Sequence, residues 1–144
     1  MLHITTLLSR DNQSSPLPSS FIDSLSPAPK TYDPTNTPQN WSENLCSTGL
    51  SIISATDRPT GKVVYEYICH QSHTNRMNNL HGGCTATIFD FCTTTALFPM
   101  SRPGFWEYAG VSRTLNVTYL KGVPVGEVTR IECEVVSIGK RLGE

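Results

Sequence analysis

Two residue types suited to chemistry lie eight positions apart in one mostly apolar segment: Gly82, which follows a histidine, and Asp90. The sequence His-Gly-Gly at 81–83 could open a helix, and its glycines let a ligand approach the backbone closely. The unpaired N–H groups at a helix start carry the positive end of the helix dipole and can hold an oxyanion or an anionic group. The alternative is a plain tight turn, since paired glycines are common in turns.

Asp90 and His81 are the only acidic or basic residues between Arg76 and Arg102. A carboxylate inside an apolar helix is costly unless it is paired, hydrated or used, which favours a functional role. The alternative is a buried aspartate bonded to neighbouring threonines or a loop N–H. Eight helical residues span about 12 Å, so Asp90 cannot easily reach a ligand at Gly82 of its own helix. If both act on one substrate, the site lies across a dimer interface with antiparallel helices.

Other polar residues nearby allow several interpretations. Asn75 could donate to a carbonyl oxygen and Ser112 could orient a water, although both types are ordinary in loops and strand starts. Cys84 lies near the helix start, where a thiol can become nucleophilic, but a free cysteine is more commonly a small core residue. The His and Cys residues between 69 and 84 show no clean zinc-ligand spacing and no paired Cys motif, so we predict no metal.

The composition narrows the class of protein. The chain has 144 residues, with 11 basic and 12 acidic residues, which suits one domain and no nucleic-acid partner. Its five cysteines are scattered, which indicates reduced thiols in an intracellular protein. No apolar stretch approaches the roughly 20 residues that span a bilayer. The start lacks a basic region before its apolar patch, so we expect a cytoplasmic or mitochondrial protein rather than a secreted one.

The elements that position these residues follow from the patterning. Residues 9–40 hold six of the ten prolines, so we expect a flexible arm over 1–40 and one domain over 41–144. A helix is expected from Gly82 to Phe98, apolar nearly all round and buried, with Pro99 ending it. Alternating apolar residues predict four strands, over residues 50–56, 62–70, 111–120 and 127–138. The first two form a hairpin. The class is α+β with an antiparallel sheet.

The order of these motifs resembles a known family. Asn75, His-Gly-Gly at 81–83, Asp90, and Ser112 ahead of Asn-x-Thr-Tyr at 116–119 are similar to the hotdog-fold acyl-CoA thioesterases. The likeness is strongest to the PaaI-like branch, which includes animal thioesterase superfamily members. It extends over about residues 45–142.

The resemblance implies a hotdog fold, a curved antiparallel sheet around one central helix, in homodimers or homotetramers. It implies hydrolysis of an acyl-CoA thioester with no metal or other cofactor. By position, the Gly82 N–H and Asn75 would polarise the thioester carbonyl. Asp90 of the partner subunit would activate water, as general base or nucleophile, and Ser112 would orient that water. His81 would lie near the thiolate leaving group.

Other residues are substrate-binding candidates. Gly83 follows the expected oxyanion site. Four basic residues could meet CoA phosphates at the rim, although each one taken singly is more commonly an ordinary solvated charge: Arg113, Lys121, Lys140 and Arg141.

Two features depart from the family pattern. Asn78 stands where the family usually has glycine, a mild change because Asn tolerates positive φ. Family members also continue for two more strands, so we expect a sheet without its last strands and with an exposed edge. This keeps open a non-catalytic hotdog module that binds acyl-CoA or a partner subunit. A hotdog dehydratase fits less well, because His81 lies at the wrong end of the motif to act as its base.

Overall fold

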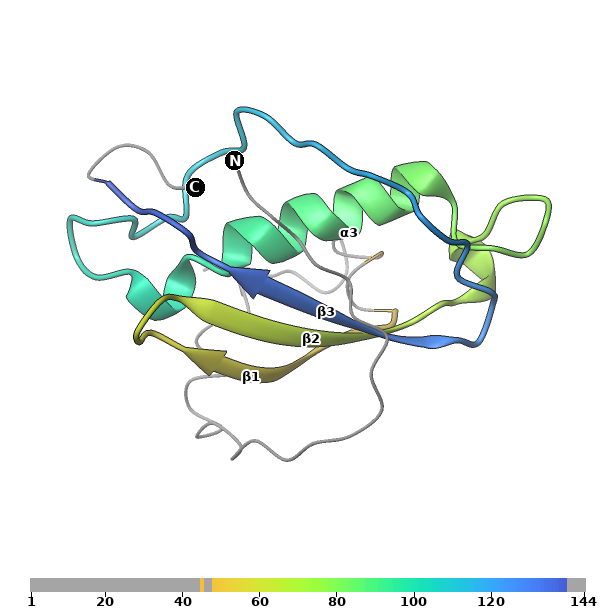
Figure 1. The fold of residues 1–144 in the computed structure, drawn as a ribbon, viewed down its shortest axis with the longest axis horizontal. Coiled ribbons are helices and arrows are strands. Elements are labelled where there is room, and N and C mark those ends of the chain that lie inside the picture. Colours follow the sequence, from red (N-terminus) through yellow and green to blue (C-terminus); the bar gives the residue numbers. More distant parts are fainter. Residues whose placement is uncertain (1–44, 46–47, 140–144) are drawn as a thin grey trace, which may run out of the picture.

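The computed structural model describes Leu45 and residues 48–139 of the chain, coloured in Figure 1. The expected arm over residues 1–40, Lys140 and Arg141 lie outside the described residues. The elements, in chain order, are β1 (Leu50–Thr56), β2 (Lys62–Ile68), the 3-10 helix η1 (Gln71–His73), α3 (Gly82–Thr95), the 3-10 helix η2 (Phe98–Met100) and β3 (Val128–Glu134).

The strands form one antiparallel sheet in the order β1-β2-β3. In the middle strand, Val63 pairs with Ala55 on one side and with Cys133 on the other. The predicted hairpin is confirmed, and β1 has the predicted bounds, while β2 ends two residues earlier than predicted. The α+β class with an antiparallel sheet is therefore confirmed.

The core lies between one face of the sheet and one stripe of α3 (Figure 1). Alternate residues of the central strand face inward and are each 1% exposed: Val63, Tyr65, Tyr67 and, just beyond β2, Cys69. From the helix, Ile88, Cys92 and Ala96 meet them at helical spacing. The Tyr65 hydroxyl donates to the Cys92 carbonyl oxygen at 3.1 Å. Every second residue of the strand thus packs against every fourth residue of the helix, and together they form one core.

The helix differs from its prediction in length and burial. It ends at Thr95, and Pro99 lies in η2 rather than ending an α-helix at Phe98. Proline suits the first positions of a new helical turn, because its missing N–H is unpaired there anyway. Only one stripe of α3 is fully buried, because the described sheet covers one side of it, and Asp90 on the other side is half-buried.

The strand predicted over residues 111–120 is absent from the sheet. This segment runs as extended chain along α3 (Figure 1). Leu115 and Val117 are half-buried and the other eight residues are exposed. The alternation is present at these two positions, but no strand among the described residues lies beside this segment to pair with its backbone, and a strand requires such a neighbour. The last strand is also shorter than predicted, Val128–Glu134 rather than 127–138.

Within residues 45 and 48–139, no helix is long and apolar enough to cross a membrane.

Candidate active site

Among the described residues, the start of α3 leaves backbone N–H groups unpaired, and that of Gly82 is one of them. His81 is the N-cap residue, and its Nδ1 accepts a hydrogen bond from the Gly83 N–H at 3.0 Å. This satisfies one of the N–H groups that every helix start leaves unpaired. The Gly82 N–H donates to no other group in the described part of the chain. A substrate oxygen can therefore use the Gly82 N–H, whereas the Gly83 N–H is occupied.

The electrostatics of α3 favour negative charge at this position. The first turn of the helix contains no acidic residue and the last turn no basic one. The positive end of the dipole is thus not offset by side chains of the first turn. Charge that develops on an oxygen near Gly82 would be stabilised without any rearrangement of the protein.

The loop before the helix presents an amide. The Asn75 Oδ1 accepts from the Met77 N–H at 2.8 Å and from the Asn79 N–H at 3.3 Å. The Asn75 backbone N–H also donates to the Asn79 carbonyl at 2.7 Å. These bonds hold the carbonyl side of the Asn75 amide in place. Its NH₂ group makes no hydrogen bond among the described residues and remains available to a ligand.

A carboxylate and a hydroxyl meet on the side of α3 away from the sheet. The Ser112 hydroxyl donates a short hydrogen bond to the Asp90 Oδ1, and the Thr94 Oγ1 lies 3.4 Å from the Ser112 Oγ. One carboxylate oxygen is thereby fixed by a neighbour while the other can hold a water. The structure thus brings together the two residues to which the family resemblance assigned water activation.

The structure does not bring Asp90 and Gly82 together within one chain. Both lie on the continuous helix α3, eight residues apart. At the rise of an α-helix this separates them by about 12 Å along its axis.

Tyr119 also belongs to this region, although the sequence placed it only in the predicted strand over residues 111–120. Its hydroxyl donates to the Gly82 carbonyl at 2.9 Å. An added Cβ at Gly82 would lie 3.6 Å from the Tyr119 ring. Residues 111–120 are therefore tied to α3 at both ends, by Ser112 near the middle of the helix and by Tyr119 at its start.

A buried polar group lies under the helix start. Tyr67 Oη and His73 Nδ1 are 2.7 Å apart. Burial, with the neighbouring His70, lowers the pKa of His73. Burial raises the pKa of Cys84 to about 11, although its hydrogen bond with Tyr67 opposes this rise. The Cys84 thiol is therefore protonated at neutral pH, which favours its role as a core residue over that of a nucleophile. No sequence motif indicated the Tyr67–His73 pair; the only signals were a tyrosine on the buried face of a strand and a histidine in the next loop.

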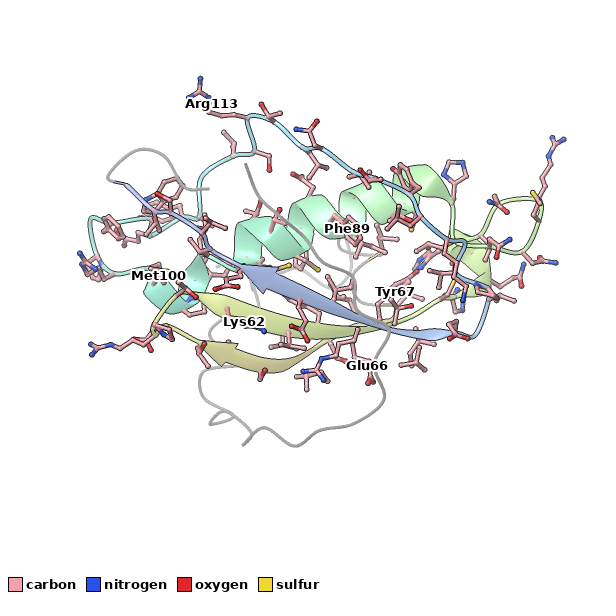
Figure 2. The ribbon with its side chains drawn as sticks, viewed as in Figure 1. Lys62, Glu66, Tyr67, Phe89, Met100 and Arg113 are labelled. Atoms are coloured by element: carbon pink, nitrogen blue, oxygen red, sulfur yellow. The ribbon has the colours of Figure 1, made fainter. Side chains whose placement is uncertain are left out.

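The candidate phosphate-binding residues lie at the surface. Arg113 and Lys121 are exposed and form no ion pair among the described residues. Figure 2 shows the Arg113 side chain directed away from the ribbon. Their role toward CoA stays a prediction.

Comparison with known proteins places this architecture in a family. The thioesterase superfamily model matches residues 77–144. Human acyl-coenzyme A thioesterase 13 is 37% identical over 93 residues, which cover 65% of this chain and 64% of that protein. The crystal structure of zebrafish thioesterase superfamily member 2 matches with a TM-score of 0.64 and 30% identity, covering 86% of this chain and 76% of that chain. The PaaI protein of E. coli, at 19% identity and a TM-score of 0.58, covers 71% of this chain and 72% of that chain and shares the fold.

The fold that the chain shares with these structures is the hotdog fold. The chain belongs to the thioesterase superfamily, as its motifs predicted. It spans 64% of the length of the human relative it matches.

Proposed function

We propose that the chain hydrolyses acyl-CoA thioesters to the free acid and CoA. Family membership and the name of the human relative support this reaction class. The observation that carries the proposal is the hydrogen bond from Ser112 to Asp90, on the same helix whose start leaves the Gly82 N–H unpaired. An activated water and an oxyanion site are the two parts that thioester hydrolysis requires.

The oxyanion site would consist of the Gly82 N–H and the Asn75 NH₂ group. Both are donors without a partner among the described residues. Together they would polarise the thioester carbonyl and stabilise the negative charge on its oxygen in the transition state. The unneutralised dipole of α3 would add to this effect.

Asp90 of the partner subunit would act on the other side of the carbonyl carbon. A second copy with its helix antiparallel would bring that carboxylate to Gly82, which the helix length prevents within one chain. As general base, it would take a proton from water while the hydroxide attacks the carbonyl carbon and the CoA thiolate leaves. As nucleophile, it would attack the carbonyl carbon and displace the thiolate, and water would then hydrolyse the mixed anhydride to the free acid and the Asp90 carboxylate. In both versions Ser112 would orient the carboxylate and its water, since it already donates to Asp90.

His81 would assist the departing thiolate. Its Nδ1 accepts from the Gly83 N–H, so the neutral imidazole carries its proton on Nε2. That N–H could donate to the leaving sulfur. Gly83 would contribute by leaving room for this ring, because an added Cβ there would lie 3.2 Å from the His81 Nδ1. Arg113, Lys121, Lys140 and Arg141 would meet the CoA phosphates at the rim.

The test is thiol release from short, long and aryl acyl-CoAs by the full chain and by Asp90→Asn. We expect kcat to fall by at least about 10²-fold, the lower end of what a general base contributes. Asp57→Asn, an exposed aspartate on the β1–β2 turn, is the matched control and should retain the wild-type rate.

Near-wild-type turnover by Asp90→Asn, with an unchanged circular dichroism spectrum, would refute the mechanism. No turnover by the wild-type chain would refute the hydrolase function and leave a module that binds acyl-CoA or a partner subunit.

A further inference from the structure

The Tyr67 hydroxyl lies where three elements meet. Tyr67 is on β2 and only 1% exposed. Figure 2 shows it at the end of β2 that lies toward the start of α3. Its hydroxyl is 2.7 Å from the Nδ1 of His73, the last residue of η1, and the two rings stack with an interplanar angle of 16°. The hydroxyl also forms hydrogen bonds with Cys84, in the first turn of α3, and with the backbone of His70. One buried hydroxyl thus connects the sheet, the loop and the helix start.

His73 in turn is linked to both donors of the proposed oxyanion site, through the backbone bond to His81 and through the chain to Asn75. Its carbonyl accepts the His81 N–H at 2.9 Å, directly before Gly82. Asn75 lies two residues further along the chain. The intervening loop is closed on itself by the bridge between Thr74 and Leu80. A shift of His73 would therefore change the distance between the Asn75 amide and the Gly82 N–H.

We propose that Tyr67 and His73 form a positioning pair that sets the distance between the Asn75 amide and the Gly82 N–H, so that both donors reach one thioester carbonyl oxygen. This inference rests on the proposed function. Neither residue touches the substrate, so they act through the loop and the helix start. A misplacement of about 1 Å in such a donor set can cost on the order of 10²-fold in rate.

The alternative is that the pair is an ordinary buried hydrogen bond that stabilises the fold. Tyr65 provides the matched control, because it is on the same strand, is equally buried, and its hydroxyl bonds the later part of the helix at Cys92 and Thr95. Replacing either tyrosine by phenylalanine removes one buried hydroxyl. Only Tyr67→Phe removes a hydroxyl that contacts the loop.

The experiment measures kcat and KM for an acyl-CoA with four variants of the full chain. We expect Tyr67→Phe and His73→Leu to lower kcat about tenfold or more with little change in KM, since the donors act mainly in the transition state. Tyr65→Phe should keep its kcat. His73→Gln should recover most of the activity, because its side-chain amide can still form a hydrogen bond with the Tyr67 hydroxyl, as donor or as acceptor. Equal kcat for Tyr67→Phe and Tyr65→Phe, or no recovery with His73→Gln, would overturn the proposal.

Amide hydrogen exchange separates this inference from the proposed function. The His81 N–H, which donates to the His73 carbonyl, should exchange faster in Tyr67→Phe than in Tyr65→Phe. This readout applies even if the wild-type chain releases no thiol, a result that would refute the hydrolase function alone. Equal His81 exchange in the two variants would show that Tyr67 does not hold the loop. If Tyr67→Phe fails to fold, the same comparison is made between His73→Gln and His73→Leu.

Discussion

At the scale of single residues, the hydrogen bond between Ser112 and Asp90 joins side chains 22 positions apart in the sequence. The sequence alone drew attention to Asp90, because a carboxylate is rare in an apolar helix unless it is paired or used. That Ser112 acts with it was implied by the family resemblance. The Tyr67–His73 pair gave no such signal. A tyrosine on a buried strand face is ordinary core, and only the path of the loop shows that its hydroxyl meets His73.

Asn78 shows how the loop tolerates a side chain where the family usually has glycine. Its φ is 56°, in the left-handed region that Asn adopts more readily than most residues. Its N–H donates to the Asn75 carbonyl at 3.0 Å, and its own carbonyl accepts from Val125 at 2.9 Å. The predicted tolerance of Asn for positive φ is confirmed.

We predict that Asn78→Ala lowers the free energy of unfolding by about 1 kcal/mol, because alanine adopts the left-handed region less readily. Asn78→Gly should change it little, since glycine adopts positive φ freely. Urea denaturation of the two variants measures both values. A loss with glycine as large as that with alanine would show that the side-chain bond from Gln71 to Asn78, not the backbone, sets the stability of the loop.

At the scale of elements, the prediction was most accurate for the helices and strands whose formation depends on neighbouring parts of the sequence. The strands β1 and β2 were predictable because they pair with each other across a short turn and alternate clearly. The end of α3 was not, because Pro99 can begin a new turn as well as end a helix. The predicted strand over 111–120 was wrong for a different reason. Alternation reports which side chains are buried, whereas a strand also needs a neighbouring backbone, which the pattern of one segment cannot show.

The contact between α3 and the sheet depends on a few large side chains. Ile88 is 1% exposed at the centre of this contact. We predict that Ile88→Ala lowers the free energy of unfolding by about 2–5 kcal/mol through lost burial and the resulting cavity. Ile53→Ala, at a strand position that is 44% exposed, should cost only about 0.5 kcal/mol. Similar losses for both variants in chemical denaturation would contradict this account of the core.

At the scale of the whole molecule, the proposed site requires two copies of the chain. Asn75 and Gly82 would come from one copy, and Asp90 and Ser112 from the other. The rise of a straight helix makes this division necessary, because no rotation of side chains closes about 12 Å. The sequence alone leads to the same proposal, because the rise of a helix depends only on residue spacing. It could not predict how the two copies meet.

We predict that two inactive variants restore activity when mixed. Asn75→Asp keeps the oxygen that holds the loop but removes the NH₂ donors, and Asp90→Asn removes the base. A mixed dimer would contain one site with both residues intact. Co-refolding equal amounts should therefore recover about a quarter of the wild-type rate, since half of the dimers are mixed and each has one intact site of two.

Each variant refolded alone is the control for this experiment. A mixture no more active than the mean of the two controls would place Asn75 and Asp90 of one chain in the same site.

The absence of acidic residues in the first turn of α3 leads to a design trade-off. A protein engineer seeking thermostability would place a glutamate at Thr85, which typically adds about 0.3–1 kcal/mol at such a helix start. In the proposed reaction, that charge would stand beside an oxygen that becomes negative and would repel the phosphate-bearing substrate. The helix is thus less stable than it could be, and the proposed oxyanion site would account for this shortfall.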